Sequence, residues 1–360
     1  MKYGRSWIRS IIPRVGHMNS LQKIQIGLKA LRYKLFKVRA PLLVSLSATG
    51  RCNLKCPYCY INVYSREPVE PSGEELKKYI DDFYALGTRI FFLQGGEPLM
   101  RKDIVEIAGY IKKKGGYVSV STNGTIHPSI AHLKGIIDHI EFSLDGSPEI
   151  NDKTRGGGVF AKIMQAAGIA REQGIKFHFH SVLNVHNCEE AQIRFIADLA
   201  RQHGTFFTAC FATSSGYENN QVFTRLVSDE KQKTTYRLLL RMKKEGAPVG
   251  MSVYALEHAL GWPIPYNVIG DKDNLPTCYK ERCLHGRLTA WFDHEGWMYP
   301  CTLAFGREGF RENIRELGVK EAWRRLSKIK CIDCGIATDI TSIFNLRFES
   351  LIDILLKKKY

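Results

Sequence analysis

The sequence predicts an α/β protein: a partial (β/α)6 barrel of the TIM-like kind, followed by a small C-terminal domain made of a β-hairpin and a helix. Six strand-like stretches alternate with helical patterns between residues 41 and 211. Gly87, Gly115 and Gly174 each follow a helical stretch and precede a strand-like one, as expected where a helix ends. Alternating βα units form parallel sheets, and in barrels their chemistry sits at the carboxyl ends of the strands.

The expected elements follow in order along the chain. Ser72 with Glu75 three residues later is a capping-box signal for the helix that ends near Gly87. The six expected strands are 42–47, 89–93, 117–121, 139–143, 176–183 and 205–211. The later expected elements are a helix over 228–245, an irregular proline-containing connector over 246–282, a β-hairpin of 288–292 and 297–299, and a helix over 319–329.

These elements divide the chain into five parts, and the net charge is not shared evenly among them. The expected division is a basic amphipathic arm over 1–40, the barrel over 41–245, the connector over 246–282, the C-terminal domain over 283–340 and a basic amphipathic helix over 341–360. The formal charge is +16, of which the first part contributes ten Lys and Arg with no acidic residue. The barrel is therefore nearly neutral, and no nucleic-acid partner is expected.

The same composition bounds the compartment. The apolar runs are too short to span a membrane, and Arg5, Arg9 and Arg14 interrupt any signal-peptide core. A cytoplasmic protein is expected, whose 10 cysteines bind metal or do chemistry rather than form disulfides.

The N-terminal arm carries an apolar stripe at helical spacing, and two interpretations stay open. The stripe is Leu21, Ile24, Leu28, Leu31, Leu35 and Val38. Either the helix lies on an anionic membrane surface or an acidic partner, which would make the protein peripheral at the membrane. In the other interpretation, the stripe packs on the barrel and leaves the lysines in water.

Three cysteines follow the first expected strand, in the order Cys52, Cys56 and Cys59. Thiolates at this spacing can converge on one soft metal centre, whereas a structural zinc site normally takes four protein ligands. The spacing alone still allows a zinc site that is completed by a distant residue. A zinc-stabilised module that binds RNA or a partner protein is therefore the non-enzymatic alternative.

The C-x3-C-x2-C spacing resembles the cluster loop of the radical SAM superfamily, and further motifs follow it in the order that this family shows. They are Gln94-Gly95-Gly96-Glu97-Pro98, Ser121-Thr122-Asn123-Gly124, Ser143-Leu144-Asp145-Gly146 and Lys153-Thr154-Arg155-Gly156. The first three lie at the ends of the second, third and fourth expected strands. The resemblance implies a 4Fe–4S cluster on Cys52, Cys56 and Cys59 whose open iron binds S-adenosylmethionine. It also implies reductive cleavage of that cofactor to a 5′-deoxyadenosyl radical, which abstracts a hydrogen atom from a substrate.

The residues that the resemblance assigns to S-adenosylmethionine lie in these motifs. They are Tyr58, Gly95, Gly96, Glu97, Ser121, Asn123, Ser143, Asp145 and Arg155. His178 and His180 lie two apart in the fifth expected strand and share a face. They either contact the substrate or form an ordinary satisfied pair.

A second cysteine set lies in the C-terminal domain. Cys283 and Cys301 flank the expected hairpin, and Cys331 and Cys334 follow the last expected helix. This pattern resembles the auxiliary-cluster domain called SPASM, in its shortened twitch form. The resemblance implies one auxiliary 4Fe–4S cluster on these four cysteines, and a four-cysteine structural zinc is the alternative. Cys278 has no assigned role.

The expected enzyme is a radical SAM oxidoreductase whose auxiliary cluster accepts an electron from the substrate radical. It would act on a small molecule, a lipid-like substrate or a peptide, and would be reduced by a low-potential donor such as flavodoxin or ferredoxin. The enzymatic alternative is a maturase that modifies ribosomally made peptides. The residues do not name the substrate or the catalytic acid and base.

Overall fold

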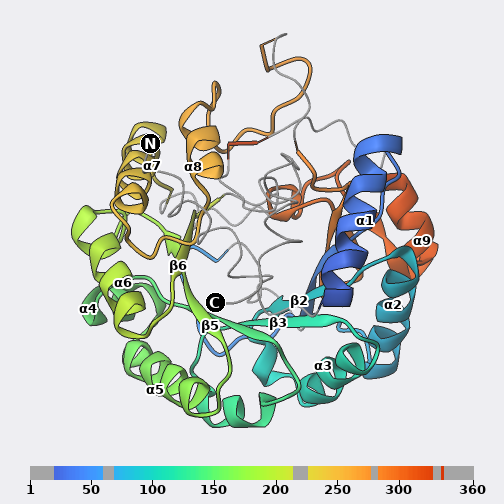
Figure 1. Cartoon of the computed structure of the whole chain (residues 1–360), viewed down its shortest axis with the longest axis horizontal. Coiled ribbons are helices and arrows are strands. Elements are labelled where there is room, and N and C mark those ends of the chain that lie inside the picture. The colour runs from blue at the N-terminus through green and yellow to red at the C-terminus, as the bar shows by residue number, and fades with distance from the viewer. Residues whose placement is uncertain (1–19, 60–68, 214–225, 277–282, 327–333, 336–360) are drawn as a thin grey trace.

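Nine strands form one curved sheet in this computed structural model, which describes residues 20–59, 69–213, 226–276, 283–326 and 334–335 (Figure 1). The strand order is β6-β5-β4-β3-β2-β1-β7-β8-β9. The strands are β1 (Leu43–Thr49), β2 (Ile90–Gly95), β3 (Tyr117–Thr122), β4 (His139–Ser143), β5 (Phe177–Leu183), β6 (Phe207–Phe211), β7 (Thr289–Phe292), β8 (Trp297–Tyr299) and β9 (Glu312–Asn313). The first six are parallel and match the six expected strands to within about two residues.

Helices surround this curved sheet, most of them on its outer face, and complete the partial barrel (Figure 1). They are α1 (Ser20–Phe36), α2 (Gly73–Leu86), α3 (Ile104–Lys113), α4 (Pro148–Arg155), α5 (Val159–Glu172), α6 (Glu190–Gln202), α7 (Asp229–Lys244), α8 (Val253–Leu260) and α9 (Ile314–Leu326), with short 3-10 turns η2 (Pro98–Met100), η3 (His127–Leu133) and η5 (Thr302–Ala304). The expected capping box forms at the start of α2, where Ser72 and Glu75 exchange side-chain to backbone hydrogen bonds. The principal core lies between the helices and alternate residues of the strands, such as Val44, Phe91 and Val120.

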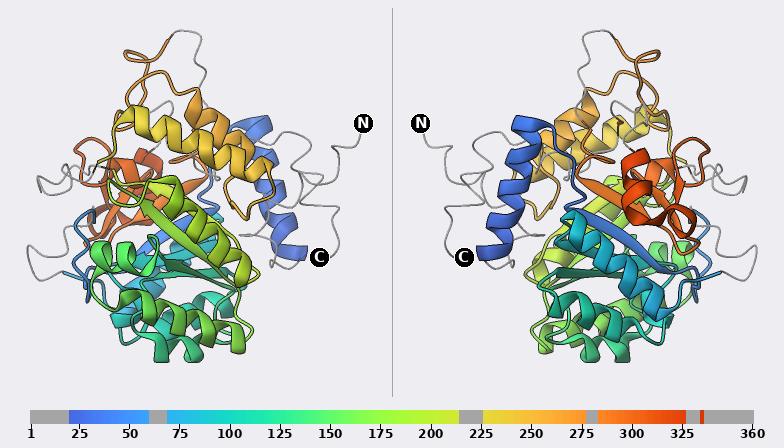
Figure 2. Two further views of the ribbon diagram at one scale, coloured as in Figure 1. Left: turned by 90° about the vertical axis from the view of Figure 1, so that its left-hand side faces the viewer. Right: turned by 90° about the vertical axis from the view of Figure 1, so that its right-hand side faces the viewer.

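The amino end of the barrel is closed by α1, which lies along one side of the molecule (Figure 2). Ile26 and Ala30 pack with Leu42, Ile90 and Tyr117, which stand at the beginnings of β1, β2 and β3. The Gln22 amide donates to the carbonyl oxygen of Gly115 at 2.8 Å. The carboxyl ends of the strands, where the predicted site lies, are therefore at the opposite end from α1.

The interpretation that the apolar stripe of α1 packs on the barrel is wrong for the described side chains. Ile24, Leu28, Leu31 and Leu35 are exposed, with Leu28 and Leu35 both 62% exposed. At 3.6 residues per turn they lie on the face opposite the buried Ile26. The helix therefore packs on the barrel through Ile26 and Ala30 and leaves its apolar stripe exposed.

Two features of the C-terminal half differ from expectation. The hairpin does not form a sheet of its own, because β7 pairs in parallel with β1 and thereby extends the barrel sheet through β8 and β9. The connector over 246–282 is not wholly irregular, since it contains α8, which starts at a Ser252 cap that accepts from the N–H of Ala255 at 3.0 Å. The expected helix over 341–360 lies outside the described residues.

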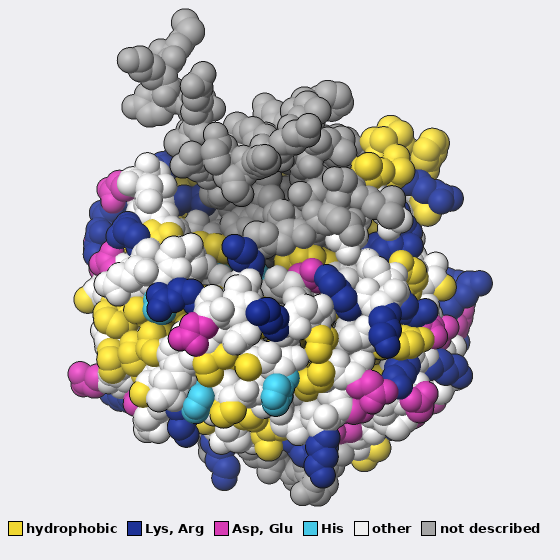
Figure 3. Space-filling model, turned by 60° about the horizontal axis from the view of Figure 1, so that its bottom comes forward, with side chains coloured by type: hydrophobic (Ala, Val, Ile, Leu, Met, Phe, Trp, Pro, Cys, Tyr) yellow, Lys and Arg dark blue, Asp and Glu magenta, His cyan; other side chains and the backbone are white. Residues whose placement is uncertain are grey.

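The described surface over α3 and α5 mixes basic and acidic side chains, which fits the nearly neutral body (Figure 3). Among the described residues, no helix has the length and apolar character needed to cross a bilayer.

Candidate functional site

The cysteine loop begins directly after β1, and its three thiols are half-buried. The N–H of Leu54 points at the Cys52 sulfur at 3.4 Å, and a turn joins the N–H of Cys59 to the carbonyl oxygen of Cys56 at 3.1 Å. None of the eight described cysteines forms a disulfide. Three thiols on one tight loop are a donor set that suits an iron–sulfur cluster.

Burial raises the pKa of Cys52 to about 11 and also raises the pKa of Cys56. For Cys52 the Leu54 N–H opposes this shift, and for Cys56 the Arg155 guanidinium does. Without a cation the thiols of Cys52 and Cys56 are therefore protonated near neutral pH. A bound metal reverses this, because its positive charge stabilises the thiolates and releases their protons.

Gly95 and Gly96 let the end of β2 approach the cysteine loop at backbone distance. The N–H of Gly96 donates to the carbonyl oxygen of Thr49 at 2.8 Å, and the N–H of Glu97 donates to that of Arg51 at 2.8 Å. A Cβ on Gly96 would lie 2.2 Å from the Arg51 carbonyl oxygen. A side chain is therefore excluded at Gly96 if the two loops are to keep this arrangement.

The Glu97 side chain is completely buried and connects the ends of β2 and β3. It accepts from the N–H of Asn123 at 2.7 Å, the hydroxyl of Thr122 at 2.8 Å and the N–H of Leu99 at 3.0 Å. Burial raises the pKa of Glu97 to about 7, although these three donors oppose the shift. The carboxylate thus positions the loops around the site.

Asn123 connects the end of β3 to the cysteine loop. Its amide donates to Asn53 Oδ1 at 2.9 Å and lies 3.9 Å from the Cys52 sulfur. Ser121 is half-buried and donates to Glu141 Oε1 at 3.1 Å, so its hydroxyl is used inside the barrel. Ser143 is also half-buried, at the end of β4.

Tyr58, Asp145 and Arg155 form a buried group at the ends of the cysteine loop, β4 and α4. Arg155 contacts both oxygens of Asp145, with Nε at 2.8 Å from Oδ2 and Nη2 at 3.1 Å from Oδ1, and the Tyr58 hydroxyl donates to Oδ2. The backbone N–H of Val182 adds a donor at 3.0 Å. Burial alone would lower the pKa of Arg155, but the interactions with Asp145 and its neighbours together outweigh burial and raise it, so the guanidinium stays charged. Burial raises the pKa of Tyr58, so its hydroxyl stays a donor.

The cysteines of the C-terminal half lie partly within the described residues. Cys283 is buried before β7, and Cys301 follows β8. A Cβ on Gly286 would lie 2.9 Å from the Cβ of Pro300, so the segment after Cys283 lies against the residue that precedes Cys301. The segments that carry Cys283 and Cys301 therefore contact each other at Gly286 and Pro300, while Cys331 and Cys278 lie outside the described residues.

The two cysteine sets share a contact that the sequence did not reveal. An aromatic cluster of Trp291, Tyr299 and Phe305 has ring centroids 4.5 to 5.9 Å apart. Both Cys59 and Cys301 pack against it. The cluster loop and the hairpin thus meet across one block of aromatic rings, because β7 lies beside β1.

The helix α8 positions the last described cysteine. His258 Nε2 lies 2.9 Å from the carbonyl oxygen of Cys334, and a Cβ on Gly335 would collide with Trp262 at 2.5 Å. The helix was not predicted, because Pro263 and Pro265, which lie close to this segment, indicated irregular structure. The Ser252 cap was the signal that could have found it.

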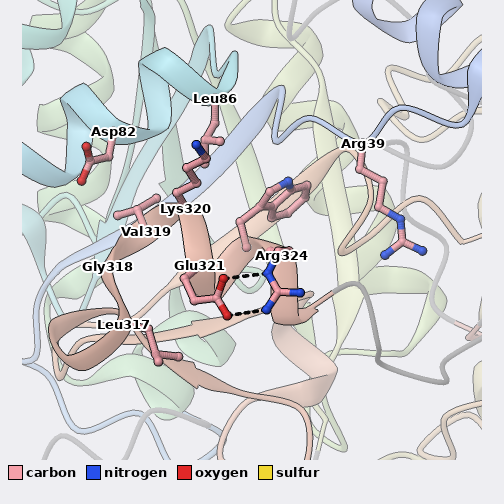
Figure 4. Close-up of a pocket in the computed structure, with 10 residues that line it drawn as sticks. Arg39, Asp82, Leu86, Leu317, Gly318, Val319, Lys320, Glu321 and Arg324 are labelled. Atoms are coloured by element: carbon pink, nitrogen blue, oxygen red, sulfur yellow. Dashed lines mark hydrogen bonds and ion pairs between the residues drawn. The ribbon is translucent and has the colours of Figure 1, made fainter.

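A groove of about 650 Å³ on the outer surface lies away from these residues (Figure 4). It is bounded by α9 and by Asp82 and Leu86 of α2. Those residues lie in the last turns of α2, which lead to the amino end of β2, and Glu321 in the groove already pairs with Arg324. The groove is therefore at the wrong end of the sheet to serve the site.

Residues 46–195 match the family described as the radical SAM superfamily. An Fe-coproporphyrin III synthase from Methanosarcina barkeri is 38% identical over 43% of this chain. The match spans 40% of that relative's length. An AdoMet-dependent heme synthase from the same organism is 27% identical over 79% of this chain and 82% of its own. SuiB of Streptococcus suis, solved with its precursor peptide SuiA, shares the fold with a TM-score of 0.63 at 15% identity, over 91% of this chain and 79% of its own.

Residues 46–195, which hold the cysteine loop and the motifs at the strand ends, belong to the radical SAM superfamily, as those motifs predicted. The fold of the chain is the partial barrel of that superfamily with a C-terminal auxiliary-cluster region. Its cofactors are accordingly S-adenosylmethionine and 4Fe–4S clusters, one of them auxiliary.

Proposed function

We propose that this protein is a radical SAM oxidoreductase whose cluster is held by Cys52, Cys56 and Cys59. The observation that carries the proposal is that these thiols meet the Gly96 loop and the Asn123 amide at one end of the barrel. When bound, the cluster and S-adenosylmethionine supply the one-electron cleavage that produces a 5′-deoxyadenosyl radical.

The chain's own residues bind, orient and shield that cofactor. The loop of Gly95, Gly96 and Glu97 presents backbone groups to the methionine portion, and Ser121, Asn123 and Ser143 offer polar side chains beside it. Arg155 supplies a fixed positive charge, because both carboxylate oxygens of Asp145 contact its guanidinium. Tyr58 is 6% exposed, so its ring offers a packing surface that excludes water from the adenine side.

The auxiliary cluster, on Cys283, Cys301, Cys331 and Cys334, is proposed as the acceptor of the electron that the oxidised substrate loses. Four thiolates leave no iron open for a substrate, which favours electron transfer. The contact of Cys59 and Cys301 with the same aromatic cluster supports a short path between the two centres. An external low-potential donor such as flavodoxin or ferredoxin would supply the first electron.

The substrate we propose first is an anionic tetrapyrrole, because both relatives compared above are named for steps of heme formation. The test is anaerobic incubation with iron coproporphyrin III and S-adenosylmethionine, with products followed by mass spectrometry. Loss of mass from the porphyrin together with 5′-deoxyadenosine would support this substrate class. Cofactor cleavage that is not stimulated by the porphyrin would reject it and leave the radical chemistry standing.

A peptide is the second candidate substrate, and the fold shared with SuiB, which binds the precursor peptide SuiA, is what favours it. A short precursor gene beside this one would supply the peptide to assay. Stimulation of cofactor cleavage by that peptide, and not by the porphyrin, would select this alternative.

Two single variants test the division of labour between the clusters. Cys56→Ala should abolish cofactor cleavage, since it removes a ligand of the cluster that binds S-adenosylmethionine. Cys334→Ala should leave cleavage partly intact while blocking substrate turnover. Equal loss of cleavage in both soluble variants would contradict this division.

We propose further that α1 docks on an anionic membrane surface at the cytoplasmic face. Its exposed face presents Ile24, Leu28, Leu31 and Leu35, and Arg32 and Lys37 are exposed beside them. A second copy of the same helix would meet equal charge, whereas anionic headgroups complement it. Because α1 closes the amino end of the barrel, docking would leave the site facing away from the membrane.

The double variant Leu28→Ser with Leu35→Ser tests the docking surface by flotation with vesicles rich in phosphatidylserine at low salt. Burying each leucine in lipid contributes about 1.5–3 kcal/mol, so binding should fall at least about ten-fold. The matched control is Val69→Ser, which changes an exposed apolar residue elsewhere on the surface. Equal binding by both variants, or no binding by the unaltered protein, would contradict the proposal.

A further inference from the structure

A row of polar side chains lines the inside of the barrel below the predicted cofactor site. On β3 to β6 the alternate residues Val120, Phe142 and Phe179 face the helices, so their neighbours along each strand face inward. The inward residues include Ser121, His139, Glu141, His178, His180, Thr208 and Cys210. They lie close beneath the cofactor site, since His180 pairs in register with Ser143 and its carbonyl oxygen accepts from the N–H of Leu144 at 2.8 Å.

Three of these side chains bring metal-binding atoms together. Glu141 and His178 are register partners on β4 and β5, and Glu141 Oε2 lies 3.1 Å from His178 Nε2. With His180, two residues further along β5, each residue offers one ligand atom, and these atoms all lie within 4.8 Å of one another. The positions are rigid, because neighbouring parallel strands fix all three backbones.

The residues around them orient these atoms as outer partners do in metal sites. Ser121 donates to the other oxygen, Glu141 Oε1, at 3.1 Å. His139 Nε2 lies 2.8 Å from His178 Nδ1. If His178 donates there, its Nε2 carries the lone pair that faces Glu141. Metal-bound imidazoles and carboxylates commonly have such partners, which fix the tautomer and the ring orientation.

Charge points the same way. Glu141 and His178 are buried, and a buried carboxylate requires a positive partner. A metal ion bound by Glu141 and the two imidazoles would supply that positive charge. Two imidazoles and one carboxylate form a ligand set that suits divalent first-row transition metals.

We propose that Glu141, His178 and His180 bind one divalent transition-metal ion inside the barrel, separate from the iron–sulfur clusters. His180 is only half-buried, so one side of the ion would face the barrel mouth. The ion would keep a coordination position for water or an oxygen of a substrate, as catalytic metal sites do. This site goes beyond the radical chemistry and does not depend on it.

The test loads the anaerobically purified, cluster-containing protein with Co²⁺ by equilibrium dialysis. The unaltered protein should take up one additional ion per chain with the weak visible absorption of nitrogen and oxygen ligands, not the intense bands of thiolate ligation. Glu141→Gln and His178→Gln should each reduce this uptake by about ten-fold or more. His203→Gln, which changes a histidine that packs on Phe177 and Phe179, should leave the uptake unchanged.

A readout on the unaltered protein keeps the proposal open to refutation if the histidine variant fails to fold. Pulsed electron paramagnetic resonance of the bound Co²⁺ should show two coordinated imidazoles. Uptake of no ion beyond the clusters, a spectrum without imidazole, or uptake that survives Glu141→Gln would each overturn the site. Those results would leave the group as a hydrogen-bonded cluster of Glu141, His178 and their neighbours without a metal.

Discussion

Asp145 is the residue on which most contacts of the candidate site converge. It is completely buried, and its carboxylate pairs with Arg155 and accepts hydrogen bonds from the Tyr58 hydroxyl and the N–H of Val182. Removing Arg155 would leave a buried carboxylate without its cation, which typically costs about 3–5 kcal/mol. We therefore expect Arg155→Ala to lower the free energy of unfolding by that amount, measured by urea denaturation of cluster-free protein.

The matched control for this prediction is Arg194→Ala. Arg194 pairs with Glu190 on the surface of α6, and both side chains are about half exposed. Exposed pairs contribute between about 0 and 1 kcal/mol, so this variant should be nearly neutral. Equal effects of the two substitutions would refute the account of Asp145.

His285 gives a prediction about pH. Burial lowers the pKa of His285 to about 4, and its Nδ1 bonds Thr289 Oγ1 at 2.9 Å. Because the unfolded chain binds a proton near pH 6.5 and the folded chain does not, the stability from this residue is present above pH 6.5 and is lost as pH falls toward 4. The melting temperature should therefore decline more steeply between about pH 7 and 5 in the unaltered protein than in His285→Asn. Parallel declines would show that His285 contributes nothing.

At the scale of elements, the approach of the β2 loop to the cysteine loop defines the site. Gly96→Ala would force the two loops apart, since the added Cβ would sit 2.2 Å from the Arg51 carbonyl oxygen. We expect this variant to retain the helical content of the protein while losing most of its cofactor cleavage. Gly157→Ala, where a Cβ meets nothing within 4 Å, is the control. Full cleavage by Gly96→Ala would contradict the proposed arrangement.

The sequence predicted the local elements well because their signals are local. Strands β1 to β6 carry alternating or continuous apolar patterns, and Ser72 with Glu75 starts α2. The pairing of β7 with β1 was not predictable in this way, because it joins residues more than 240 positions apart. The sequence predicted which segments carry the candidate site. The contacts of Asp145 with Tyr58 and Arg155, and the hydrogen bonds by which Glu97 connects β2 and β3, are visible only in the three-dimensional structure.

At the scale of the whole molecule, the barrel has two functionally different ends. α1 closes the amino end and presents apolar and basic side chains outward, while the cysteine loop and the strand ends lie at the other. If α1 docks on lipid, the substrate reaches the site from solution, which argues against a substrate taken from within the bilayer. The proposed metal site lies between these ends, inside the barrel.

The cysteine loop is proposed to hold the cluster that cleaves S-adenosylmethionine. The most direct measurement is the iron and sulfide content of anaerobically purified protein, with 5′-deoxyadenosine assayed after adding dithionite and S-adenosylmethionine. We predict about eight irons per chain with 5′-deoxyadenosine formed, since two 4Fe–4S clusters are expected. Zinc in place of iron, with no 5′-deoxyadenosine after cluster reconstitution, would contradict the account and favour a zinc-stabilised binding module.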